Sequence, residues 1–170
     1  MPEASSSEAA VWPGQPIRVL LLDVDGTLTD GGMYFSADGL VMKRFDVKDG
    51  LGIRLLQAVG VEVALISAVD SPVTLARARH LRIEHVVMAC RDKARAVREV
   101  LRQRELAPGQ ACYMGDDLTD LPAFAEVGHP VAPADSVPEV RAAAQYVTRA
   151  AAGHGAVREV CDLIRAALPR

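Results

Sequence analysis

The 170-residue chain is poor in aromatic residues, in cysteine and in net charge. Aromatic residues make up 4% of the chain and the formal net charge is −3, which argues against a nucleic-acid or an anionic-membrane partner. The three cysteines, Cys90, Cys112 and Cys161, form no close pair, so we expect reduced thiols in a cytoplasmic protein rather than disulfides or a zinc site. No apolar run reaches the roughly 18 residues that a membrane-spanning helix needs.

Half of the residues are hydrophobic, which at this length allows one domain with its own core. Residues 1–16 lack the charged and then apolar pattern of a secretory signal. We therefore expect residues 1–16 to be a disordered tail and residues 17–170 to fold as a single domain.

Short apolar runs alternate with helical patterns along the rest of the chain. Strands are predicted at 17–22, 61–66, 84–87, 111–114 and 129–132, and helices at 49–59, 92–105 and 155–168. This alternation predicts an α/β fold, a three-layer Rossmann-like parallel sheet with helices on both faces. Residues 33–45 interrupt it with two strand-like pieces around Ala37-Asp38-Gly39, which predict a β-hairpin projecting beyond the first strand, with no cap domain.

Acidic residues follow two of the predicted strands. Asp23 and Asp25 lie in "LLLDVDGTLTDGG" at 20–32, and a second group lies in "YMGDDLTDL" at 113–121. Carboxylates near a core are costly without partners, although turn and helix-cap roles are an ordinary alternative. Because ligands of open α/β sheets bind at the carboxyl ends of strands, we expect these loops to meet Ser67 and Lys93 at one edge.

The residue types at this edge favour phosphate chemistry. Carboxylate oxygens suit Mg²⁺, while a lysine and a hydroxyl suit phosphate oxygens. A carboxylate can attack phosphorus once the negative charge of the phosphate is neutralised. A second acid, two residues on, can protonate the leaving group. A kinase is less favoured, because the chain has no GxxxxGK[ST] motif.

The motifs also resemble those of a known superfamily. "DVDGTLTDG" resembles the first motif of the haloacid dehalogenase superfamily, DxDGT, and "GDDLTD" resembles its fourth, with Ser67 and Lys93 in the second and third positions. "FDVKDGLGIRLL", "GDDLTDLP" and "YVTRAAAGHGAVREVCDLI" resemble the 3-deoxy-D-manno-octulosonate 8-phosphate phosphatase family, from about Ile17 to Leu168. That resemblance implies a capless Mg²⁺ phosphatase and a homotetramer, in which the hairpin and a tail that includes 153–155 close a neighbour's site.

The resemblance also implies roles for individual residues. Asp23 would be the nucleophile and a metal ligand, and Asp25 the general acid and base with its carbonyl on the metal. Asp116 would complete the metal ligands, and Ser67 and Lys93 would hold the phosphate, Lys93 also serving catalysis. Asp117 and Asp120 would have supporting roles, although a helix-cap role is an alternative for Asp120. The residues implied to bind the sugar acid are Asp46, Asp49, Gly50, Arg54, Arg77 and His154.

The chain departs from the family pattern where the substrate is chosen. Ala68 and Val69 stand where the family usually has Gly and Arg, and His154 stands where it usually has Arg. Asp70 would repel an acidic sugar. The leading hypothesis is hydrolysis of 3-deoxy-D-manno-octulosonate 8-phosphate through an aspartyl-phosphate intermediate. The alternatives are a phosphatase of a related nonulosonate 9-phosphate or another sugar phosphate, and a tetrameric scaffold with little activity.

Overall fold

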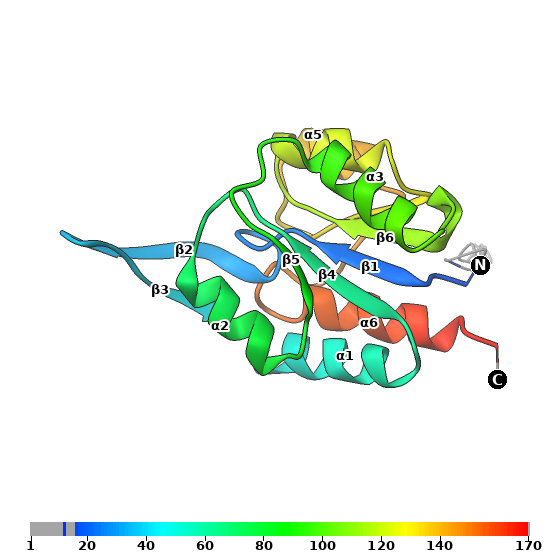
Figure 1. Ribbon diagram of the computed structural model, residues 1–170, viewed down its shortest axis with the longest axis horizontal. Coiled ribbons are helices and arrows are strands. Elements are labelled where there is room, and N and C mark those ends of the chain that lie inside the picture. The colour runs from blue at the N-terminus through cyan, green and yellow to red at the C-terminus, as the bar shows by residue number, and fades with distance from the viewer. Residues whose placement is uncertain (1–11, 13–15, 170) are drawn as a thin grey trace, which may run out of the picture.

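The computed structural model describes Trp12 and residues 16–169 of the chain (Figure 1). Most of the expected disordered tail, residues 1–11 and 13–15, lies outside the described residues. Trp12 stacks on Tyr146, with ring centroids 5.4 Å apart. None of the helices within the described residues has the length and apolar character needed to cross a membrane.

A parallel sheet of six strands forms the centre of the molecule, in the order β5-β4-β1-β6-β7-β8. The strands are β1 (Val19–Leu22), β4 (Glu62–Ile66), β5 (His85–Val87), β6 (Ala111–Met114), β7 (His129–Ala132) and β8 (Tyr146–Val147). β1 lies in the middle, paired with β4 on one side and β6 on the other. All of its side chains are buried, because both faces of the sheet are covered.

Helices pack on both faces of this sheet (Figure 1). One face carries α1 (Val47–Ala58), α2 (Pro72–His80) and α6 (Ala156–Ala166), and the other carries α3 (Lys93–Gln103), α4 (Leu121–Phe124) and α5 (Pro138–Ala143). Leu20 and Leu22 of β1 face the first group, and Val19 and Leu21 face the second, as the period of two requires. Two short 3₁₀ helices, η1 (Pro108–Gln110) and η2 (Leu118–Asp120), precede and follow β6. The predicted three-layer α/β architecture is confirmed.

The predicted hairpin is also confirmed, and it projects from the body of the molecule (Figure 1). It consists of β2 (Thr29–Ser36) and β3 (Gly39–Phe45), and begins earlier than predicted because Thr29 pairs with Phe45 at its base. Among the described residues, this hairpin is the whole connection between the β1 loop and α1, with no cap domain. Tyr34, Phe35 and Met42 are exposed along it.

Residues 153–155 are not a free tail but a loop that leads into α6. Gly153 has a φ of +64°, and a Cβ atom there would lie 2.4 Å from the backbone nitrogen of Asp30. Only glycine therefore allows this loop to pack against the start of β2. Arg44 of β3 holds the same loop by donating to the Gly153 carbonyl oxygen at 2.6 Å.

Candidate active site

The predicted acidic residues meet at the carboxyl ends of the two central strands. Asp23 directly follows β1, and Asp116 and Asp120 lie in the segment after β6. The backbone N–H of Asp23 donates to the Met114 carbonyl oxygen at 3.0 Å, which extends the pairing of β1 and β6 into the site. The parallel register thus brings together acids about ninety positions apart in the sequence.

Lys93, at the start of α3, joins two of these acids. Its Nζ atom lies 2.6 Å from Asp23 Oδ1 and 2.6 Å from Asp120 Oδ1. Lys93 itself is 5% exposed. Burial alone would lower the pKa of Lys93, but the two carboxylates raise it above its ordinary value. Lys93 therefore remains a cation beside Asp23.

Asp120 is fully buried and organises the site. Its Oδ1 accepts from Lys93 and, at 2.7 Å, from the Tyr113 hydroxyl. Its Oδ2 accepts from the backbone N–H groups of Asp116, at 3.0 Å, and Asp117, at 3.2 Å. Gly115 leaves the room for this carboxylate, because a Cβ atom there would lie 2.4 Å from Asp120 Cγ. These contacts go well beyond a simple helix cap.

The site carries an excess of negative charge. Oxygens of Asp23, Asp116 and Asp120 lie within 4.8 Å of one another. Three carboxylates and the Lys93 ammonium give a charge of −2 when all four groups are ionised. Burial and the Asp120 charge raise the pKa of Asp23 well above its usual range, and that of Asp116 to about 6. A divalent cation would offset this excess.

Asp23 and Asp116 are the carboxylates best suited to hold such a cation. Asp120 already uses both oxygens for hydrogen bonds, whereas the Asp116 carboxylate accepts at Oδ1 from the Thr27 hydroxyl, at 3.1 Å. Gly26 preserves the space beside Asp116, because a Cβ atom there would lie 2.1 Å from Asp116 Oδ2. Its φ of +89° also favours glycine.

Asp25, the second acid of the β1 loop, faces a partner that the sequence reasoning missed. Lys43 Nζ lies 2.6 Å from Asp25 Oδ1 and 2.9 Å from Oδ2. Lys43 belongs to β3, where Met42 before it is exposed while Lys43 is buried. A strand places Lys43 on the same face as Phe45, but the sequence does not mark that face as the inner one.

Ser67 and Asp117 also lie in loops at this edge of the sheet. Ser67 follows β4 and is buried, and its hydroxyl exchanges hydrogen bonds of 3.2 Å with the backbone of Val69. Asp117 is exposed and caps η2 by accepting from Leu118 N–H at 2.7 Å. Ala68 and Asp70 are exposed in the loop after Ser67.

Most of the residues implied to bind the sugar lie around the base of the hairpin. Asp46 caps α1, and its carbonyl oxygen accepts from Arg77 at 3.1 Å. Arg77 also lies over the Phe45 ring and fills the space beside Gly50, where a Cβ atom would meet Arg77 Nη2 at 2.5 Å. His154 is exposed in the loop before α6.

Asp49 has a structural contact that the sequence reasoning did not foresee. Its side chain is fully buried and accepts from the backbone N–H groups of Arg158, at 2.8 Å, and Gly155, at 3.4 Å. Burial raises the pKa of Asp49 above its ordinary value. Asp49 therefore joins the first turn of α1 to the first turn of α6.

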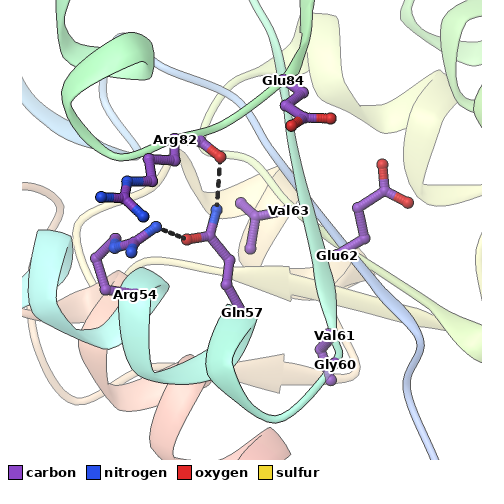
Figure 2. Close-up of a pocket in the computed structure, with 8 residues that line it drawn as sticks. All are labelled: Arg54, Gln57, Gly60, Val61, Glu62, Val63, Arg82 and Glu84. Carbon is purple, nitrogen blue, oxygen red and sulfur yellow. Dashed lines mark hydrogen bonds between the residues drawn. The ribbon is translucent and has the colours of Figure 1, made fainter.

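Arg54 lies apart from the acidic cluster. Its guanidinium donates to Gln57 Oε1 at 3.0 Å and to the Leu81 carbonyl oxygen at 3.3 Å. Figure 2 shows it beside Arg82 in a pocket whose other wall is the beginning of β4. This is the amino end of the strand, so the structure does not bring Arg54 to Asp23 and Lys93.

Comparison with known proteins gives consistent matches. A family model described as haloacid dehalogenase-like hydrolase matches residues 63–160. The 3-deoxy-D-manno-octulosonate 8-phosphate phosphatase of Yersinia pestis is 45% identical over 148 residues, 87% of this chain and 79% of the relative. The enzyme of that name from Escherichia coli K12 is 43% identical over 158 residues, 93% of this chain and 84% of the relative.

Solved structures agree with these matches. The phosphatase of the same name from Moraxella catarrhalis, in complex with magnesium, phosphate and KDO, has a TM-score of 0.84 at 36% identity, covering 87% of this chain and 85% of that chain. The cobalt-bound deoxy-D-mannose-octulosonate 8-phosphate phosphatase of Haemophilus influenzae has a TM-score of 0.86 at 38% identity, covering 88% and 87%. The resemblance seen in the motifs is thereby confirmed, and the chain belongs to the 3-deoxy-D-manno-octulosonate 8-phosphate phosphatase family of haloacid dehalogenase-like hydrolases.

Proposed function

We propose that this chain is a Mg²⁺-dependent phosphatase that hydrolyses 3-deoxy-D-manno-octulosonate 8-phosphate through a phosphorylated Asp23. The observation that carries the proposal is the buried contact of Lys93 with Asp23 and Asp120, with Asp116 beside them. A nucleophile, a fixed cation and spare carboxylate oxygens are the groups that phosphoryl transfer from a monoester needs.

The reaction takes two steps. An Asp23 oxygen attacks phosphorus, the bond from phosphorus to the sugar oxygen breaks, and the Asp25 carboxyl gives its proton to that oxygen. Water then attacks the phosphorylated Asp23, Asp25 takes a proton from the water, and phosphate leaves with Asp23 restored. Lys93 has three N–H donors and gives two of them to Asp23 and Asp120, so the third is available for a phosphate oxygen.

The Asp23 and Asp116 carboxylates, with the Asp25 backbone carbonyl, would hold Mg²⁺. The excess of carboxylates over ammonium groups and the hydrogen-bonded state of Asp120 support this choice of ligands. When bound, the ion supplies charge neutralisation for the phosphate, so that an anionic carboxylate can approach phosphorus. Asp117 and Asp120 serve as supports, because both hold the backbone of the loop after β6.

For substrate recognition, we propose that Ser67 contacts the phosphate and that Asp46, Gly50, Arg77 and His154 form the sugar side of the site. The printed names of the relatives support the octulosonate 8-phosphate as substrate. Ala68 and Val69, which replace the usual Gly and Arg, instead favour a related nonulosonate 9-phosphate or another sugar phosphate as the second candidate.

We also propose that the chain works in the cytoplasm as a homotetramer, with residues 17–170 as its domain. The exposed apolar side chains of the projecting hairpin, Tyr34, Phe35 and Met42, support assembly through this element. A neighbour's hairpin could then complete a site that the chain's own residues leave open.

The test is phosphate release by purified protein with Mg²⁺ from a panel of sugar phosphates. We expect a preference of about tenfold or more for the octulosonate 8-phosphate, which is about 1.4 kcal/mol in transition-state binding. Asp23→Asn should abolish release while leaving the assembly unchanged in light scattering. A preference for another compound would support the second candidate, and no release from any compound by folded protein would refute the phosphatase.

A further inference from the structure

Lys43 is a buried cation that the proposed reaction does not use. Its side chain has no exposed surface, and burying an ammonium is costly unless it is paired. Its Nζ donates hydrogen bonds to Asp25 Oδ2 at 2.9 Å and to the Thr74 hydroxyl at 3.3 Å, and it forms an ion pair with Asp25 Oδ1 at 2.6 Å. Asp25 lies in the β1 loop, Lys43 in β3 and Thr74 in α2, so this contact joins three separate elements.

Both ends of this contact are held by regular structure. Lys43 pairs with Met33 across the hairpin and lies two residues before Phe45, which pairs with Thr29 at the base after a shift in register. Thr74 is fully buried in the first turn of α2, and its backbone N–H donates to Ser71 Oγ, the cap of that helix. The ammonium is therefore fixed in position before any substrate arrives.

We propose that Lys43 is a positioning residue for Asp25, holding the carboxyl group in the orientation from which it transfers protons. This inference rests on the proposed function. A short acidic side chain in a loop has several rotamers, and contact of one ammonium with both oxygens selects one of them. Lys43 itself neither gains nor loses a proton, because the proton passes from Asp25 to the leaving oxygen.

The leaving group provides the test, because only a poor leaving group needs a proton from Asp25. We compare the single-turnover release of the sugar from a sugar phosphate with the first-turnover burst of p-nitrophenolate from p-nitrophenyl phosphate. For Lys43→Met, we expect the sugar release to slow by about tenfold to a hundredfold, within the range that general acid catalysis supplies. The p-nitrophenolate burst should stay within about threefold of the unchanged protein.

Further variants separate positioning from a structural role. Lys43→Gln keeps an N–H donor and should recover part of the sugar release. Adding Lys43→Met to Asp25→Asn should slow the sugar release no further. Arg102→Met, a change at an exposed arginine of α3, should leave both rates unchanged. If Lys43→Met does not fold, Thr74→Val removes only one partner of the ammonium, and must still slow the sugar release more than the burst.

An equal loss on both substrates would overturn the inference, whether or not the melting temperature falls. Additive losses with Asp25→Asn would also overturn it. A different result, in which the unchanged protein releases phosphate from neither compound, would refute the proposed function instead.

Discussion

Replacing Asp120 by asparagine tests whether this residue organises the active site. The change keeps the shape of the side chain but replaces one acceptor oxygen by an NH₂ group. Two donors then lose their acceptor. They are either Lys93 and Tyr113 or the backbone N–H groups of Asp116 and Asp117, depending on which oxygen is replaced. Asp120 has no exposed surface, so water does not take the place of the lost acceptor. A buried donor without a partner costs about 1–3 kcal/mol, so two cost about 2–6 kcal/mol.

An opposing effect comes from charge. Asp120 raises the pKa of both Asp23 and Asp116, so its removal relieves their repulsion. We expect the lost hydrogen bonds to dominate and leave a net loss of about 2 kcal/mol in the free energy of unfolding. For a chain of this size that corresponds to a Tm lower by about 4–8 °C.

The assay is thermal unfolding in EDTA and across a Mg²⁺ titration. The variant should melt lower in EDTA yet still gain stability from Mg²⁺, because Asp23 and Asp116 remain. Asp117→Asn, a change at the exposed neighbour, serves as the matched control and should shift the Tm by less than about 2 °C. A Tm that rises in EDTA for Asp120→Asn would refute the reasoning, because repulsion would then outweigh the hydrogen bonds.

Three other outcomes are expected. In EDTA, the free energy of unfolding measured with urea should fall by up to about 3 kcal/mol as the pH rises from 4 through about 6. The reason is that Asp116 has a raised pKa in the folded protein and therefore holds its proton more tightly there than in the unfolded chain. Mg²⁺ should remove this dependence on pH. Gly26→Ala should abolish the Mg²⁺-induced rise in Tm, since its Cβ would displace the Asp116 carboxylate, and an unchanged rise would contradict this. Phe35→Ser should weaken the proposed tetramer in light scattering without lowering the Tm of the dissociated chain, since Phe35 is 68% exposed. An unchanged assembly would exclude this side chain from the proposed interface.

The sequence allowed the fold and the acidic cluster to be predicted because both follow from local patterns. β1 is an uninterrupted apolar run, and acids placed directly after parallel strands must meet at one edge. α2 was missed because its apolar residues are few and scattered, although Ser71 and Pro72 mark its start.

The remaining contacts depend on tertiary packing. Lys43 reaches Asp25 because the base of the hairpin turns its inner face toward α2, and no local pattern specifies that angle. Arg54 was assigned to the sugar from its place in a motif. In the structure its guanidinium packs near the amino end of β4, and Arg54 also lines a second pocket with Gly50 and Arg77. Asp49 binds backbone groups more than one hundred positions away.

The contact of Asp49 with α6 has a consequence for synthesis of the protein on the ribosome. A growing chain that ends before residue 158 lacks the Arg158 N–H group that Asp49 binds. It also lacks the apolar residues of α6 that pack against α1. The base of the hairpin is likewise incomplete until the loop at Gly153 reaches Asp30 and Arg44. Asp49 and the base of the hairpin, both in the first third of the chain, therefore reach their final arrangement only after the last helix has emerged, so nascent chains should gain activity late.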